Sequence, residues 1–177
     1  ARCHGARLSR ATLAAGDAPG PIGFGSSVDI DGDLAVVGAM GADPTSPVIE
    51  GAAYVFRRNG TEWAHEVKLK GGYSAPADLF GRSLRLSGKK LVVGAPGENG
   101  NRGAVYAFRK EGSEWYGIDR IVMVDYGPGA RFGSSVSTDG SLVVVGVPGA
   151  DSGPHNDIGS VNVFPIASVD CDQNGLT

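Results

Sequence analysis

The side chains of this chain that could do chemistry are mainly carboxylates and amides, and one group of them lies near the end of the sequence. Asp170, Asp172 and Asn174 are followed by Gly175, which matches positions 1, 3, 5 and 6 of an EF-hand-type calcium loop. The acidic residue that such a loop carries at position 12 is not in the sequence. We therefore weigh a calcium site here against a polar terminal segment with no ligand.

A second group of polar residues lies in three stretches, residues 41–52, 97–103 and 149–159. These stretches differ from one another more than their surroundings do, and loops on a rigid scaffold are where binding usually occurs. Calcium and sugar hydroxyls are the ligands that their oxygens could hold, and simple solvation is the alternative. The candidate ligand residues are Asp43, Glu50, Glu98, Asn99, Asn101, Asp151, Asn156 and Asp157.

Catalytic constellations are absent from the sequence, so we expect no enzyme and no catalytic residues. The three histidines, His4, His65 and His155, stand apart, and no H-E-x-x-H zinc pair occurs. The serines of the Phe-Gly-Ser-Ser stretches lack the following glycine of a nucleophile elbow. We therefore expect no cofactor, with calcium as the one exception to consider.

Charge and hydropathy exclude two further classes of protein. The net charge is −3 and the basic residues are scattered, so the chain lacks the basic stripe that nucleic-acid binding requires. No apolar run approaches the roughly 20 residues of a transmembrane helix. We expect neither a nucleic-acid partner nor membrane insertion.

The elements that must position these loops are revealed by an internal repeat. Phe24, Phe80 and Phe132 each precede a glycine, and a second set of aligned glycines follows 14 residues later in each copy. Phe56, Phe108 and Phe164 close the copies. Such register across three copies is the signature of a repeat architecture.

Each copy reads as four antiparallel strands, which we name A to D. Strand A begins at the Phe-Gly pair, and a two-residue turn such as Asp31-Gly32 leads to strand B, which is apolar on both faces. Strand C is the AYVF-type segment, and Asn59-Gly60 turns it into strand D. In the first strand D, the alternating residues Trp63, His65, Val67 and Leu69 are expected to share one face.

These boundaries define one all-β domain over residues 1–167, followed by a polar tail at 168–177. The repeats span about 24–69, 80–124 and 132–166, and residues 5–15 resemble a strand D that precedes the first copy. Four-stranded units of about 50 residues with doubly covered inner strands are typical of β-propeller blades. A solenoid of stacked hairpins is the all-β alternative.

The motifs resemble the FG-GAP repeat, which builds the β-propeller of integrin α-subunits. The match is literal in the second copy, with Phe80-Gly81 and Gly94-Ala95-Pro96, and the resemblance covers roughly residues 5–166. It implies an extracellular or cell-surface module for adhesion or scaffolding. The integrin-like version has a calcium loop between strands A and B. A tight turn stands there in all three copies, so the aspartates of DIDGD in the first copy are not assigned to calcium.

The strand order is circularly offset, because a lone strand D precedes copy one and no clear strand D follows copy three. The N-terminal strand can complete a last blade, either that of its own chain or that of a neighbour. Cys3 starts this strand and Cys171 follows the last strand C, so a Cys3–Cys171 disulfide would replace the missing C–D link. Two unrelated thiols and a fragment of a longer propeller are the alternatives.

The sequence therefore predicts a non-catalytic extracellular structural or adhesion module that self-assembles by strand complementation into a ring or fibre. The expected partner is a second copy of the chain. The alternatives are a calcium- or glycan-binding adhesin or lectin-like propeller that uses the B–C loops, with a glycan or a surface protein as its ligand, or a piece of a longer propeller. Asn59-Gly60-Thr61 is also a glycosylation sequon, which places a candidate modification on Asn59.

Overall fold

A computed structural model describes residues 11–16, 23–41, 51–72, 75, 77–151 and 158–166. Their strands form three antiparallel sheets, which we call blades 1, 2 and 3. Blade 1 contains β1 (Phe24–Asp31), β2 (Leu34–Ala39), β3 (Ala52–Asn59) and β4 (Glu62–Leu69). Blade 2 contains β5 (Ser83–Ser87), β6 (Lys90–Ala95), β7 (Ala104–Glu111) and β8 (Glu114–Ile121). Blade 3 contains β9 (Ser135–Thr138), β10 (Leu142–Val147) and β11 (Ser160–Pro165).

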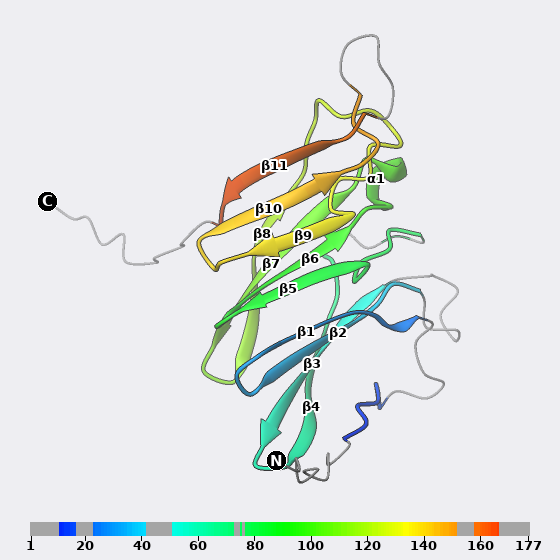
Figure 1. Ribbon diagram of the computed structural model, residues 1–177. Coiled ribbons are helices and arrows are strands. Elements are labelled where there is room, and N and C mark those ends of the chain that lie inside the picture. Colours follow the sequence, from blue (N-terminus) through cyan, green and yellow to red (C-terminus); the bar gives the residue numbers. More distant parts are fainter. Residues whose placement is uncertain are drawn as a thin grey trace, which may run out of the picture.

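Within each blade the strands pair in chain order, and the blades follow one another through their first strands. β1 lies beside β5, and β5 lies beside β9, so the three sheets succeed each other along the molecule (Figure 1). A single short turn, α1 (Glu98–Asn101), is the one element of the described chain that is not a strand. The predicted all-β, propeller-like arrangement of antiparallel blades is confirmed.

The apolar core lies between the blades rather than within one of them. One layer lies between the facing sides of blades 1 and 2 and contains Val36, Val55 and Phe80. A second layer joins blade 2 to blade 3 and contains Val92, Phe132 and Val145. A third layer, with Val37 and Tyr54, covers the other face of blade 1. Both faces of β2 and β6 are therefore covered, and the two strands are apolar throughout except for Lys90 at the start of β6.

The hairpin turns lie one residue later than the sequence predicted. Asp31 pairs with Leu34, so the loop between β1 and β2 is Gly32-Asp33 and not Asp31-Gly32. Gly32 has a φ of +58°, which a residue with a Cβ adopts only at a cost. The C–D turn of blade 1 is likewise Gly60-Thr61, and Asn59 is the last, exposed residue of β3.

The prediction that alternating residues of β4 share one face is wrong, because a β-bulge interrupts the strand. Val55 pairs with Val67 while Phe56 pairs with His65, which leaves Glu66 as the extra residue. Trp63 packs on the side of blade 1 that faces away from blade 2, whereas Val67 contributes to the layer that faces blade 2. Glu66 is thereby directed toward blade 2 instead of toward solvent.

The predicted N-terminal strand at 5–15 is described only in its last part. Residues 11–16 form no strand, and residues 1–10 lie outside the described residues. Leu13 and Ala15 nevertheless pack on the free side of blade 1, beside Phe24 and Tyr54. Leu69 and Ile121 stand at the repeat position of Leu13. Leu69 packs in the layer between blades 1 and 2, and Ile121 packs in the layer between blades 2 and 3.

Candidate functional site

The contact between successive blades is built by the Phe-Gly and Gly-Ala pairs of the repeat. Ser27 Oγ of blade 1 donates a 2.7 Å hydrogen bond to the carbonyl oxygen of Gly81, the first blade-2 glycine. A Cβ added at Gly38 would overlap that same carbonyl, and one added at Gly51 would overlap the backbone of Phe80. The Phe-Gly pair of one blade therefore docks into a socket formed by a serine and two glycines of the preceding blade.

The same joint recurs between blades 2 and 3. Ser83 Oγ donates a 2.8 Å hydrogen bond to the carbonyl oxygen of Gly133. A Cβ at Gly94 would overlap this carbonyl, and one at Gly103 would overlap the backbone of Phe132. Gly81 and Gly133 have φ values of +89° and +87°, so both docked glycines hold the same left-handed conformation.

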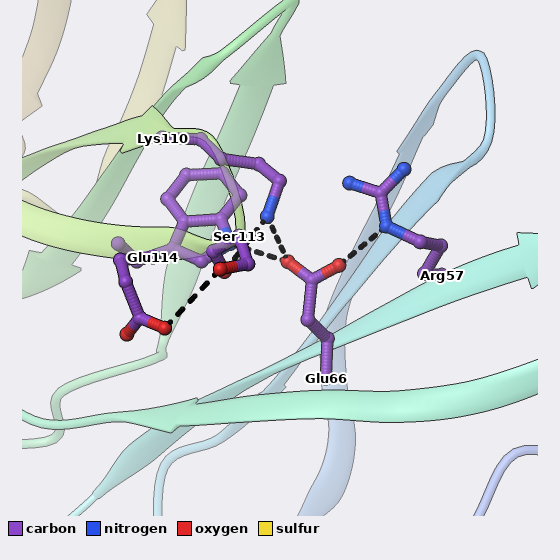
Figure 2. A network of polar contacts seen from close by, with 6 residues as sticks. Arg57, Glu66, Lys110, Ser113 and Glu114 are labelled. Atoms are coloured by element: carbon purple, nitrogen blue, oxygen red, sulfur yellow. Dashed lines mark hydrogen bonds and ion pairs between the residues drawn. The ribbon is translucent and has the colours of Figure 1, made fainter.

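A polar clamp centred on Glu66 reinforces the joint between blades 1 and 2 (Figure 2). The carboxylate of Glu66 lies between Arg57 on its own blade and Lys110 on blade 2, and accepts hydrogen bonds from both. Trp115 Nε1 donates a third hydrogen bond, of 2.9 Å. Burial alone would raise the pKa of Glu66, but the hydrogen bonds from Lys110, Trp115 and Arg57 outweigh it and hold the pKa below its ordinary value.

The joint between blades 2 and 3 has apolar residues at the positions equivalent to Glu66 and Lys110. Ile118 is the bulged residue of β8, as Glu66 is of β4, and Ile166 donates its N–H to Ser141 as Lys110 does to Lys89. Both isoleucines belong to the layer between blades 2 and 3. The two joints therefore share their glycine and serine contacts but differ in their peripheral contact, which is ionic in one and apolar in the other.

Among the predicted ligand residues, Glu98 has a structural role. It is 4 % exposed, accepts a 2.7 Å hydrogen bond from the Tyr106 hydroxyl, and is paired with Arg120. Burial and the neighbouring Glu98 raise the pKa of Tyr106 to about 12. Burial raises the pKa of Asp78, and the nearby negative charge of Glu98 raises it further.

The remaining predicted ligand residues are exposed or lie outside the described residues. Asn99 and Asn101 are exposed and have positive φ, and the Asn101 carbonyl accepts hydrogen bonds from Gly129 and Arg131 of the segment that enters blade 3. Asp151 is exposed as well. The residues outside the described ranges are Cys3, Asp43, Glu50, Asn156, Asp157, Asp170, Cys171, Asp172 and Asn174.

The aspartates of the A–B hairpin in blade 1 are engaged with blade 2. Asp29 accepts a 2.7 Å hydrogen bond from the Leu86 N–H and contacts Arg85, while Asp31 accepts one of 2.6 Å from the Gly88 N–H. These carboxylates position the next hairpin. Across the described ranges, no group of three or more His, Cys, Asp or Glu side chains is arranged to hold a metal ion. No helix in those ranges has the length and apolar character needed to span a membrane.

The fold thus defines a propeller-type repeat protein whose blades are joined by Phe-Gly pairs. The sequence model of the FG-GAP repeat matches residues 8–56, 63–108 and 115–164, and the chain belongs to this family. The second and third matches begin in β4 and β8 and continue through the next blade, whereas the first begins at residue 8, outside the described residues. The comparison with curated proteins found no match for the chain.

The joint residues were not identified from the sequence, although a signal for them exists. Ser27, Ser83 and Ser135 stand three residues after the phenylalanine in all three copies. A hydroxyl that recurs at one position of an otherwise apolar repeat indicates a repeated hydrogen bond. The clamp residue Glu66 carries no such signal, because the corresponding residue of the second copy is Ile118.

Proposed function

We propose that this chain is a non-catalytic structural module of an extracellular or cell-surface assembly, in which copies associate by strand complementation. The N-terminal segment at 5–15 of one copy pairs with β11 of another, and a Cys3–Cys171 disulfide links the two chains. FG-GAP repeats are typical of extracellular and surface proteins, and this supports the proposed location.

The observation that carries the proposal is the open edge of blade 3. β3 and β7 each have two neighbours in their sheets, whereas β11 pairs with β10 alone among the described strands. An exposed edge strand offers unpaired N–H and C=O groups to another chain. Among the described residues of the N-terminal segment, Leu13 and Ala15 pack on blade 1, and residues 11–16 are not one of the strands of its sheet.

The test combines electrophoresis without reductant and hydrogen exchange. We expect a disulfide-linked species of at least twice the chain mass that disappears in Cys3→Ser. We also expect the backbone amides of β11 to gain protection from exchange as protein concentration rises. A chain that runs as a monomer without reductant and leaves β11 unprotected at every concentration contradicts the proposal.

The second candidate is a ligand-binding adhesin that uses the B–C loops. It is favoured by the exposed Asn99 and Asn101, whose backbone is held by the hydrogen bonds of the Asn101 carbonyl. Rigid loops with exposed amides suit sugar hydroxyls. Binding to a glycan array that is reduced in the Asn99→Ala and Asn101→Ala double variant supports this function, and equal binding by the variant contradicts it.

A further inference from the structure

Blade 3 contains a third socket of the kind that joins the other blades. Its residues are Ser135, Gly146 and Gly159, which stand at the repeat positions of Ser83, Gly94 and Gly103. A Cβ at Gly146 would overlap the Ser135 hydroxyl, as a Cβ at Gly94 would overlap that of Ser83. The serine is therefore oriented in the third socket as it is in the docked one.

This third socket faces an open groove. The groove has a volume of about 590 Å³, and its lining includes Ser135, Gly146 and Gly159. In the two internal joints the same place holds the backbone of a Phe-Gly pair, Phe80-Gly81 or Phe132-Gly133. The groove therefore has the position and lining of a Phe-Gly docking site.

The opposite end of the described chain carries a Phe-Gly pair that is not docked. Gly25 has a φ of +92°, close to those of Gly81 and Gly133, but a Cβ at Gly25 would meet no atom of the described residues within 4 Å. Phe24 is partly exposed, whereas Phe80 and Phe132 are fully buried. The Phe24-Gly25 pair of blade 1 thus has the backbone conformation of a docked pair, but no described blade precedes it.

The sheet faces around the socket and the free pair are apolar and exposed. On blade 3, Val161 is 68 % exposed, whereas its repeat equivalents Ala53 and Val105 are buried. On blade 1, Val28 is 68 % exposed, whereas its equivalent Leu84 is 8 % exposed. At the internal joints, the face equivalent to that of Val161 is covered by the face equivalent to that of Val28 on the next blade.

From these four observations we infer that the groove of blade 3 receives Phe24-Gly25 of a second copy of this chain, with Ser135 Oγ donating to the Gly25 carbonyl. The contact repeats the geometry of the internal joints, so blade 1 of one copy follows blade 3 of the other. It is heterologous, because two different surfaces meet. The inference rests on the proposed self-assembly. It adds the relative orientation of the two copies and a second contact between them, besides the strand pairing at β11.

Two variants with one blocked surface each test the inference. Val161→Lys places a charge on the blade-3 face, and Val28→Lys places one on the blade-1 face; both side chains are exposed in the single chain, so each variant should fold. Val124→Lys is the matched control, because Val124 is 84 % exposed and belongs to neither face. Circular dichroism confirms folding, and light scattering after size exclusion gives the mass.

With reductant present, so that no Cys3–Cys171 bond holds the copies together, we expect the wild-type chain and Val124→Lys to associate and each face variant to be monomeric. An equimolar mixture of the two face variants should form a dimer, because each supplies the unmodified surface that the other lacks. Association that persists in both face variants overturns the docking while leaving strand donation at β11 standing. A wild-type chain that is monomeric at all concentrations overturns both, and a mixture that stays monomeric overturns the heterologous orientation.

Discussion

The Ser27 hydroxyl donates a 2.7 Å hydrogen bond to the carbonyl oxygen of Gly81, which lies in the next blade. The two residues are 54 positions apart in the chain, so one short polar contact fixes the register between two sheets. Ser83 and Gly133 repeat it between blades 2 and 3. The Phe-Gly motif therefore serves as a joint between blades, which explains why it recurs at the start of each blade.

Removal of the serine hydroxyl at a joint should destabilise the fold. In Ser83→Ala the Gly133 carbonyl loses its donor, and a lost hydrogen bond of this kind costs about 1 kcal/mol. Ser27→Ala should cost less, because Ser26 Oγ lies 3.3 Å from the same Gly81 carbonyl and can replace the donor.

Urea unfolding in dilute protein measures both free energies. Ser135→Ala is the control, because the Ser135 hydroxyl faces the open groove in the single chain. Equal unfolding midpoints for Ser83→Ala and Ser135→Ala contradict a stabilising role for the joint hydroxyl.

Loss of the Glu66 carboxylate should be more costly, because it leaves a buried cation unpaired. Lys110 is only 4 % exposed, and removal of one partner of such a pair costs about 3 kcal/mol. We expect Glu66→Ala to lower the free energy of unfolding by that order. Glu62→Ala, on the exposed start of the same strand, is the control.

The second joint suggests how this loss can be recovered. Ile118 and Ile166 occupy the positions of Glu66 and Lys110 there. A well-packed apolar pair can replace a buried ion pair without loss of stability. The double variant Glu66→Ile and Lys110→Ile should therefore be more stable than Glu66→Ala in a denaturant titration. A double variant as unstable as the single one contradicts the equivalence of the two joints.

The blades could be predicted from the sequence because their landmarks recur in three copies. A repeated Phe-Gly pair fixes where each strand A begins, and the apolar strand B implies a sheet covered on both faces. The bulge at Glu66 could not be predicted, because strict alternation has no signal for one extra residue. The burial of Glu98 could not be predicted either, because an acidic residue in a loop is expected to be exposed. Only the folded strands β7 and β8 bring Tyr106 and Arg120 to its carboxylate.

Asp78 should make stability depend on pH in the direction opposite to most carboxylates. Burial and the charge of Glu98 raise its pKa above the ordinary 3.8, against the lowering effects of the Ala75 N–H and Arg120. The raised pKa gives a stabilising contribution that is fully present below the ordinary value and is lost as pH rises through the folded value. Asp78→Asn keeps a neutral acceptor for the Ala75 N–H at every pH.

We therefore expect Asp78→Asn to be more stable than the wild-type chain at pH 7 and to lose this advantage near pH 3. Thermal unfolding of both proteins at the two pH values measures the difference. A variant that is destabilised at pH 7 shows that the charged form of Asp78 is the stabilising one.

Asp139 should titrate far below an ordinary carboxyl group, because it holds the turn between β9 and β10. Its Oδ1 accepts hydrogen bonds from the Ser141 N–H, the Ser141 hydroxyl and the Leu142 N–H, at 2.7 to 2.8 Å. These donors favour the ionised form and lower the pKa of Asp139 to about 2. The stabilising contribution is present above the ordinary 3.8 and is lost as pH falls through about 2.

Carbon-detected NMR of the side-chain carboxyl group should therefore give a midpoint near 2 for Asp139. In Ser141→Ala the hydroxyl donor is gone while both backbone donors remain, so the midpoint should rise but stay below 3.8. The Ser141 and Leu142 amides should exchange faster once the carboxylate is protonated, because the bonds that it accepts weaken. A midpoint near 3.8 in the wild-type chain, unchanged by Ser141→Ala, contradicts the role of Asp139 in holding this turn.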